Sequence, residues 1–391
     1  MKKSITRSLS TAILTCILAS SLISCESAFR PDVQNTEHNK NSDTLLTDTT
    51  IIETAPQSET EESVPTDTAK TELIFEDDAT ETYDTLFSYM KQYPSLELFN
   101  TGSTVLTAEE YVSLCEVNPA VTVISKVQFE GTVLDLSLNE IDISEKIIAD
   151  KEDFDALLSH FPAGIKLVMC DCGYTDEEMG ALRDKHAKLD FTWRIYMGKW
   201  SLRTDDEAFS VMIYDDNYVR LTSEDIEVLR YCTNMYALDL GHQAITDLSV
   251  IGEMTDLRVL ILADNKITDL TPLSSLKNLQ YLELFVNRIS DLSPLAKCTN
   301  LVDLNFGWNS IYDLSSIYSL EKIERLWLPT TRVSSDKRAE ITENFPNAQI
   351  VFEDVNSISS GWRTHERYFS MRGMFNNNKY DPNFVKNKDG E

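Results

Sequence analysis

The sequence has 391 residues, enough for two or three domains with a sizeable core. Its 64 acidic and 35 basic residues give a formal net charge of −29 at pH 7. This charge argues against nucleic acid or an anionic membrane surface as the partner, because the phosphate groups of both would repel it.

The N-terminus has the pattern of an export signal. It begins with three basic residues, Lys2, Lys3 and Arg7. The apolar run that follows, Leu9 to Ile23, is too short to span a bilayer. It ends in Leu22-Ile23-Ser24-Cys25, which resembles a bacterial lipobox and so implies a lipid on the cysteine. We expect a lipoprotein signal peptide over residues 1–24 and an extracytoplasmic protein anchored to the bacterial cell membrane through Cys25. Ordinary secretion with cleavage nearby is the alternative.

A change of composition marks the next segment, residues 25–82. It is rich in Thr, Ser, Asp and Glu and contains few aromatic residues. Such a segment buries too little apolar surface to offset the entropy of ordering it, and its like charges repel one another. We therefore predict a disordered acidic tether that lifts the folded part off the membrane.

Folded structure is predicted from Tyr83, in an N-terminal α/β region over residues 83–232. Apolar residues recur at helical spacing over residues 83–90. Thr107 and Glu110 form a capping box, which predicts a helix to about Glu116. A β-prone run over residues 121–129 and an amphipathic helix over residues 154–161 follow.

Two stretches of this region fit the pattern L-x-L-x-x-N-x-I, which is repeated more regularly later in the chain. The first stretch has Leu134, Leu136, Asn139 and Ile141 at the pattern positions. The second has Leu167, Met169, Cys172 and Tyr174, so that Cys172 takes the place of the asparagine. We interpret both stretches as degenerate repeats.

Residues 233–335 contain five units of one repeat. The units begin at Met235, Leu257, Leu279, Leu301 and Ile323, so that each is 22 residues long. Each follows L-x-x-L-x-L-x-x-N-x-I, which is the leucine-rich repeat pattern. Asn265, Asn287 and Asn309 form the asparagine column, and Gln243 and Thr331 replace asparagine in the first and last units.

The spacing within a unit predicts its structure. Alternation along L-x-L turns the leucines inward and the residues between them outward, as on a β-strand. The return segments Asp269-Leu270-Thr271-Pro272 and Asp291-Leu292-Ser293-Pro294 suit the start of a short helical turn. We predict an α/β solenoid, a leucine-rich-repeat horseshoe with short parallel strands on the concave face and short helical or 3-10 turns on the convex face.

The residues after the array are predicted to close it. A closing strand over residues 345–352 belongs to a C-terminal cap over residues 336–375. Residues 376–391 are rich in Asn, Lys and Gly, and we expect a flexible tail there.

Several motifs resemble those of known surface proteins. Met169-Cys170-Asp171-Cys172-Gly173 and Gly361-Trp362-Arg363-Thr364-His365-Glu366-Arg367-Tyr368-Phe369 resemble parts of leucine-rich-repeat surface lipoproteins of Firmicutes. The 22-residue units are similar to those of the internalin group, whose horseshoes bind host or bacterial proteins. The resemblance implies recognition of a protein, although a fold by itself does not fix a function.

Catalytic and metal-binding motifs are missing from the sequence. It contains no G-x-S-x-G, no H-E-x-x-H and no phosphate-binding glycine loop. Cys170 and Cys172 lack a second Cys/His pair at zinc-like spacing. We therefore predict a non-catalytic protein with no cofactor and no metal. The alternative is an enzyme whose site lies in the N-terminal region, with Glu109, Glu110 and Asp135 supplying acid/base chemistry.

The candidate binding site is a strip of outward strand residues on the predicted concave face. It comprises Asp239, Ile261, Tyr281, Glu283, Phe285, Asp303, Asn305, Trp308, Arg325 and Trp327. The leucine core does not require aromatic side chains at these positions, and clustered exposed aromatics mark binding sites. With acidic residues among them, they suit a protein or peptide that carries Lys or Arg. A glycan stacked on the aromatic rings is one alternative, and flanking regions folded over the strip are another.

Overall fold

The computed structural model describes residues 69–76, 78–211, 218–353 and 361–385, all within one compact unit, Thr66–Glu391. The expected signal peptide, Cys25 and most of the tether lie outside the described residues. In the ranges that are described, no helix has both the length and the apolar character needed to cross a membrane.

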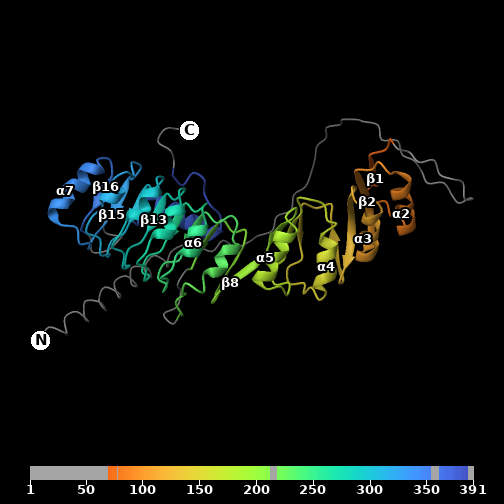
Figure 1. Ribbon diagram of the computed structural model, residues 1–391, viewed down its shortest axis with the longest axis horizontal. Helices are drawn as coiled ribbons and strands as arrows, with labels where there is room; N and C mark the ends of the chain where they lie inside the picture. The colour runs from red at the N-terminus through yellow and green to blue at the C-terminus, as the bar shows by residue number, and fades with distance from the viewer. Residues whose placement is uncertain (1–68, 77, 212–217, 354–360, 386–391) are drawn as a thin grey trace, which may run out of the picture. The chain divides into compact units, whose positions relative to one another are not determined.

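The first sheet has the strand order β1-β2-β3-β4 (Figure 1). Its strands are β1 (Glu72–Ile74), β2 (Leu98–Thr107), β3 (Thr122–Phe129) and β4 (Thr132–Asp135). Strand β1 pairs in parallel with β2, with Leu73 opposite Phe99. Ordered structure therefore begins before Tyr83, which corrects the expected end of the tether at residue 82.

Two helices of this part match their sequence signals. Helix α2 (Tyr83–Gln92) covers the stretch of helical periodicity, and its Leu86 and Met90 are buried. Helix α3 (Ala108–Val117) begins at the predicted capping box, in which the Thr107 side chain accepts the N–H of Glu110 and the Glu110 carboxylate accepts the N–H of Thr107. The local sequence was sufficient here because a capping box satisfies backbone donors that the helix itself leaves unpaired.

The first degenerate repeat differs from its prediction. Leu134 lies on β4, which runs antiparallel to β3 in a hairpin with Leu134 opposite Val127. The parallel strand comes later, at β5 (Glu140–Asp142), where Ile141 lies opposite Leu167. The prediction therefore placed the repeat too early in the chain. Leu134 and Leu136 are buried, as the leucines of a repeat would be, so the two cases have the same apolar pattern.

The second degenerate repeat has the geometry of the later units. It belongs to the parallel sheet β5-β6-β7, which has β6 (Lys166–Val168) at its centre and β7 (Asp190–Thr192) at its edge. The Sγ of Cys172 lies 3.1 Å from the carbonyl oxygen of Ile143, as the amide nitrogen of Asn265 lies 2.9 Å from that of Leu240. Cys172 thus takes the asparagine position, as predicted.

Helices and a hairpin complete this part of the chain. Helices α4 (Lys151–Leu158) and α5 (Asp176–Lys185) connect the strands of this sheet to one another, and the hairpin of β8 (Arg194–Met197) and β9 (Trp200–Arg203) leads to the array. The 3-10 helix η2 (Glu227–Tyr231) precedes the first predicted repeat. Helix α4 starts and ends earlier than the expected range of 154–161, because the Asp150 side chain accepts the N–H of Asp153 and fixes the start.

The array forms one parallel sheet, β10-β11-β12-β13-β14-β15-β16 (Figure 1). Its strands are β10 (Ala208–Ser210), β11 (Ala237–Asp239), β12 (Val259–Ile261), β13 (Tyr281–Glu283), β14 (Asp303–Asn305), β15 (Arg325–Trp327) and β16 (Gln349–Val351). Corresponding residues of successive units lie opposite one another, as Leu260 and Leu282 do. The five predicted strands and the closing strand β16 are present, and β10 is an additional strand that the repeat pattern did not reveal.

Asparagine side chains hold successive units together. The Asn265 carbonyl accepts the N–H of Ile245 at 3.0 Å, while its NH₂ donates to the carbonyls of Leu240 and Leu262. In the first unit the Gln243 side chain accepts the N–H of Leu221 at 2.8 Å. Each side chain satisfies backbone groups that the turn would leave unpaired inside the protein.

Short helical turns return the chain to the next strand. They are α6 (Ser249–Glu253), η3 (Thr271–Ser275), η4 (Ser293–Lys297) and η5 (Ser315–Ile317). A proline lies in the first turn of η3 and of η4, as predicted, and the Asp269 carboxylate accepts the N–H of Thr271 at 2.8 Å. Alternating parallel strands and short turns over a leucine core confirm a solenoid.

The C-terminal residues lie partly at the end of the array and partly on its sheet. Helix α7 (Ser335–Asn344) and β16 close the end. Helix α8 (Glu366–Asn377) packs against the sheet, with contacts to β10 and β11. Tyr380 and Phe384 are also buried, which corrects the expected flexible tail for residues 376–385. Residues 386–391 lie outside the described structure.

Candidate functional site

The candidate strip lies on what we call the outer sheet face, the side of β11 to β15 opposite the leucine core. Eight of its ten predicted residues have an exposed fraction of 7% or less, and Asp239 and Trp308 are half-buried. The eight are Ile261, Tyr281, Glu283, Phe285, Asp303, Asn305, Arg325 and Trp327. The expectation of exposure is therefore corrected: residues 361–385, which we call the C-terminal segment, cover the face. That these residues bind a partner stays a prediction.

Trp362 of the C-terminal segment enters an aromatic slot on the outer sheet face. Its ring centroid lies 5.3 Å from that of Tyr281 and 5.1 Å from that of Trp327. The indole N–H donates to the Glu283 carboxylate at 2.7 Å, and the Arg325 guanidinium lies 4.4 Å from the ring centroid. Trp362 is fully buried, so that two tilted aromatic contacts, a cation–π contact and a hydrogen bond together hold one side chain.

Asp303 binds two guanidinium groups at once. Arg325 donates to its two oxygens at 2.9 and 2.6 Å. Arg367 of helix α8 also donates to both oxygens, each at 2.8 Å, and its remaining nitrogen reaches Glu324 at 2.8 Å. The Asp303 side chain is 1% exposed and that of Arg367 12% exposed. Planar, two-pronged pairs of this kind are the most specific contacts between arginine and carboxylate.

Buried carboxyl groups between the sheet and the segment have shifted pKa values. Burial raises the pKa of Glu283, although the charge of Arg363 and hydrogen bonds from Tyr281 and Trp362 oppose the shift. Burial likewise raises the pKa of Asp239, whose carboxylate accepts the N–H of Gly241 at 2.9 Å. Their ionised forms are disfavoured because the surrounding protein replaces part of the water that would stabilise the charge.

The end of the C-terminal segment extends the contact along the sheet. The Tyr380 ring packs 5.4 Å from Tyr236, and the Phe384 ring lies 5.9 Å from Tyr281. The N–H of Tyr380 donates to the Glu207 carboxylate at 3.0 Å. The contact thus runs from Glu207, just before β10, to Trp327 on β15.

A second feature lies at the end of the strands, where each unit turns. One residue in each unit has a left-handed backbone: His242, Asp264, Val286, Trp308 and Thr330, with φ values of 62, 51, 58, 52 and 54°. Each of the first four donates its N–H to the next unit, as Asp264 does to Phe285 at 2.9 Å. L-residues adopt this conformation at a cost of about 1–2 kcal/mol, so these side chains occupy positions that would favour glycine or asparagine.

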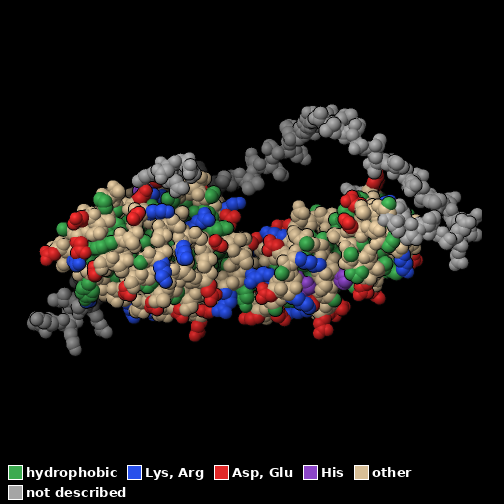
Figure 2. All heavy atoms as spheres, turned by 45° about the horizontal axis from the view of Figure 1, so that its top comes forward, with side chains coloured by type: hydrophobic (Ala, Val, Ile, Leu, Met, Phe, Trp, Pro, Cys, Tyr) green, Lys and Arg blue, Asp and Glu red, His purple; other side chains and the backbone are tan. Residues whose placement is uncertain are grey.

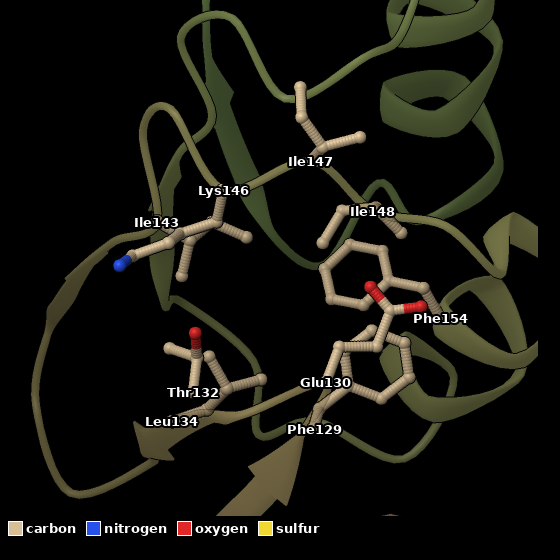
Figure 3. Close-up of a pocket in the computed structure, with 9 residues that line it drawn as sticks. All are labelled: Phe129, Glu130, Thr132, Leu134, Ile143, Lys146, Ile147, Ile148 and Phe154. Atoms are coloured by element: carbon tan, nitrogen blue, oxygen red, sulfur yellow. The ribbon is translucent and has the colours of Figure 1, made fainter.

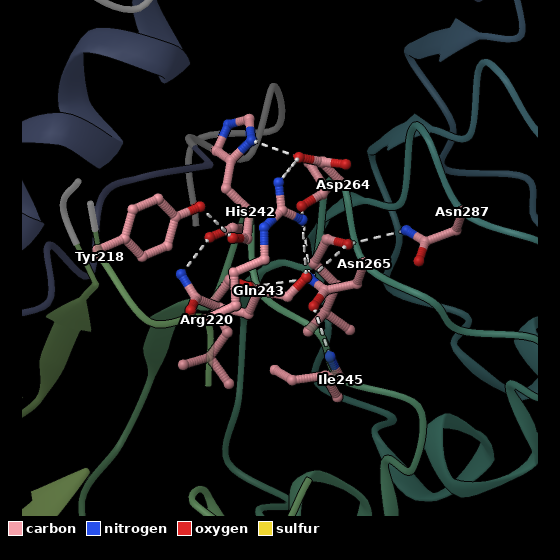
Figure 4. Close-up of polar contacts among 12 residues, drawn as sticks. Tyr218, Arg220, His242, Gln243, Ile245, Asp264, Asn265 and Asn287 are labelled. Carbon is pink, nitrogen blue, oxygen red and sulfur yellow. Dashed lines mark hydrogen bonds and ion pairs between the residues drawn. The ribbon is translucent and has the colours of Figure 1, made fainter. Parts of the chain in front are cut away.

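Polar contacts join three side chains of this column and its neighbourhood (Figure 4). The Asp264 carboxylate lies 3.1 Å from the Nδ1 of His242 and 3.2 Å from Arg220. The Tyr218 hydroxyl donates to the carbonyl of His242 at 2.6 Å. Burial raises the pKa of Asp264, but the hydrogen bond from His242 and the charges of His242 and Arg220 outweigh it and hold the pKa below its ordinary value. The network anchors the first turn of the array.

A small cavity lies in the N-terminal region (Figure 3). Phe129 and Phe154 form one side of it, and Ile143 and Leu134 the other. Its volume is about 20 Å³, which is room for a single water molecule. The Glu130 carboxylate accepts the N–H of Ala149 and of Asp150 and so caps the chain before α4 rather than facing a ligand. This cavity is too small for a substrate.

The cysteines and other possible metal ligands of the described ranges do not form a cluster. Cys115, Cys170, Cys172, Cys232 and Cys298 are free thiols, and no group of three or more Cys, His, Asp or Glu in these ranges could hold a metal ion. Burial raises the pKa of Cys172 and Cys298 to about 11, so both are neutral at physiological pH. On the face shown in Figure 2, acidic and basic side chains are interspersed.

Comparison with known proteins agrees with the repeat pattern. Residues 255–297 match the family model described as leucine rich repeats (2 copies). These residues are leucine-rich repeats. No curated protein matches the chain.

Solved structures that match parts of this chain include two internalins of Listeria monocytogenes. The internalin inlF is 19% identical with a TM-score of 0.33, over 70% of this chain and 74% of its own. Internalin C2 is 20% identical with a TM-score of 0.31, over 57% of this chain and 88% of its own. An LRR protein of Leptospira interrogans is 16% identical with a TM-score of 0.34, over 70% of this chain and 75% of its own.

Residues of the C-terminal segment were not among the predicted site residues. Trp362 and Arg367 provide its main contacts, yet they lie 79 and 64 residues beyond their partners Glu283 and Asp303. The available signal was the composition of the segment, which combines Trp, Tyr, Phe and Arg in a stretch after the last repeat. Aromatic and arginine side chains are the usual anchors of a polypeptide contact.

Proposed function

We propose that this protein is a non-catalytic binding protein, held on the outside of the bacterial cell membrane by a lipid on Cys25, and that its leucine-rich repeats recognise another protein. The observation that carries the recognition is the outer sheet face. Its aromatic and charged side chains are not needed by the leucine core, and they hold a polypeptide segment through tilted aromatic contacts and paired hydrogen bonds.

The acceptor groups of the face support a partner that carries guanidinium or other N–H donors. Glu283, Asp303 and Glu324 each accept a hydrogen bond from an indole or guanidinium group of the C-terminal segment. The net charge of −29 acts in the same direction at longer range, because it attracts cationic proteins and repels anionic ones.

The anchoring proposal is tested by replacing one residue. In the native host, the parent chain should fractionate with the membrane, and a Cys25→Ser variant should be released into the medium or keep an uncleaved signal. Metabolic labelling with a fatty acid should mark the parent alone. Identical fractionation and no label in either chain would refute the lipid anchor.

Recognition is tested by capture of proteins from membrane and culture material. The bait is residues 26–391, beside a variant of the face and its rim, Asp303→Asn with Trp308→Ala, and a control on the return segments, Lys297→Ala with Glu321→Ala. We expect one protein to bind the parent and the control but not the first variant. Equal capture by all three chains would place the site elsewhere. A capture lost after glycosidase treatment of the material would favour the glycan alternative.

A further inference from the structure

The C-terminal segment lies on the outer sheet face as a ligand lies in a binding site. We infer that this face is a peptide-recognition site. Its protein partner presents a tryptophan and, five residues later, an arginine in the first turn of a helix. In the absence of that partner, the chain's own residues 361–385 occupy the site. The inference rests on the proposed function and names the chemistry of its partner.

The tryptophan is recognised by groups of the sheet alone. The rings of Tyr281 and Trp327 pack in tilted arrangements against the Trp362 ring, and Glu283 accepts its N–H at 2.7 Å. The lining comes from strands β13 and β15, whose positions are fixed by parallel pairing with their neighbours. The slot is therefore built by the array, and any polypeptide that presents an indole in this orientation would make the same contacts.

The arginine is recognised by a carboxylate that the array holds in place. Arg325 pairs with both oxygens of Asp303 from the neighbouring strand, at 2.6 and 2.9 Å. When Arg367 leaves, Asp303 keeps this partner and is not left as an unpaired buried charge. Glu283 likewise keeps the hydroxyl of Tyr281. The empty face thus retains satisfied polar groups, which a site that opens and closes requires.

The segment differs in charge from the rest of the chain. Residues 361–385 contain the basic residues Arg363, Arg367, Arg372 and Lys379, against only Glu366 and Asp381. A net positive segment in a chain of −29 complements the acidic side chains that it contacts. A competing partner must share this charge as well as the two anchor residues.

The helix start positions the arginine relative to the tryptophan. The Nδ1 of His365 accepts the N–H of Arg367 at 3.2 Å and caps helix α8. The carbonyl of Trp362 accepts a hydrogen bond from Arg325 at 3.3 Å. Backbone and side chains are therefore fixed together over these residues, which is why the inference specifies spacing and a helix start rather than composition alone.

The test uses a synthetic, fluorescently labelled peptide of residues 361–385 and chain 26–391 carrying Trp362→Ala and Arg367→Ala, which frees the face. We expect the peptide to bind this variant in an anisotropy titration and to bind the parent at least tenfold more weakly, because the tethered segment competes at an effective concentration on the order of millimolar. Adding Asp303→Asn to the variant should weaken binding at least tenfold.

Matched peptides show whether the anchors carry the recognition. A peptide with the Trp362→Ala and Arg367→Ala changes should not bind. A peptide with Phe369→Ala should bind like the parent peptide, because Phe369 is 62% exposed. Equal binding by all three peptides, or no binding to a variant that retains its circular dichroism spectrum, would overturn the inference.

Hydrogen exchange of the parent supplies a second measurement that needs no variant. If the segment can leave the face, amides of α8 (Glu366–Asn377) exchange when the segment is released. The free energy of this opening is then lower than the free energy of opening for amides of β13 and β14. Exchange of α8 only with global unfolding would make the segment a permanent part of the fold and overturn the inference.

The two proposals fail separately. A captured partner that the peptide does not displace would leave the proposed function standing and overturn the site. Peptide binding to the freed variant without any captured partner would leave the site standing and count against the proposed function.

Discussion

Asn265 offers a quantitative test of how the repeats are held together. The residue is 7% exposed, and its side chain satisfies the N–H of Ile245 and the carbonyls of Leu240 and Leu262. Alanine at this position leaves these backbone groups without their partner inside the protein. A buried group left unpaired costs about 1–3 kcal/mol, so we expect Asn265→Ala to lower the free energy of unfolding by about 3–5 kcal/mol.

A matched control separates burial from the hydrogen bond itself. The Asn278 side chain also donates to a backbone carbonyl of the preceding unit, that of Thr255 at 3.1 Å, but it is exposed. Water replaces that partner, so Asn278→Ala should change stability by no more than about 0.5 kcal/mol. Urea unfolding of chain 26–391, followed by circular dichroism, measures both variants. Similar losses for the two, or a loss below about 1 kcal/mol for Asn265→Ala, would refute the reasoning.

Three further outcomes are expected. Burial raises the pKa of Glu283 above its ordinary value of 4.5. The parent should therefore lose stability relative to Glu283→Gln as the pH rises from about 4.5 through the raised pKa. Urea unfolding midpoints of the two chains that change in parallel up to about pH 8 would contradict this. Thr330→Gly should raise the free energy of unfolding by about 0.5 kcal/mol, because Thr330 has a left-handed backbone with φ of 54°. Thr331→Gly should lower the free energy of unfolding, because it removes the hydrogen bond to the carbonyl of Leu328. Thermal unfolding that ranks the two variants in the opposite order would contradict backbone strain at Thr330. Burial raises the pKa of Cys298 to about 11, so an alkylating reagent at neutral pH should modify this thiol only when urea unfolds the chain. Mass spectrometry that finds Cys298 modified in the folded chain would contradict its burial.

The sequence predicted the structure correctly where a short stretch or the repeat pattern determines the local conformation. The capping box at Thr107 and the prolines that open the return turns act within one turn of the chain. The asparagine column joins neighbouring units, and the exact period of the repeat places these units next to one another. Cys172 was placed correctly for the same reason, because its position in the repeat pattern fixes which backbone groups it meets. Leu134 was placed incorrectly, because buried leucines on an antiparallel strand give the same local sequence pattern as the leucines of a repeat.

Exposure of the candidate strip could not be derived from the same pattern. Alternation along a strand shows which side chains face away from the core, but it does not show whether another segment covers them. Glu283 and Asp303 were predicted to meet a basic partner, and they meet Trp362 and Arg367 of the chain itself. Asp303 thus contacts an arginine and Glu283 an indole, both from the same chain, and a basic partner protein stays a prediction.

The 22-residue period alone determined the parallel strands, the leucine core and the outward position of Tyr281 and Trp327, because each unit repeats the same short-range geometry. Only the tertiary structure decided that residues 361–385 return to the sheet and that Asp303 pairs with two arginines at once. The physical reason is the distance along the chain. Contacts between residues 64 and 79 positions apart depend on where the whole array places its surface, and no local periodicity encodes that position.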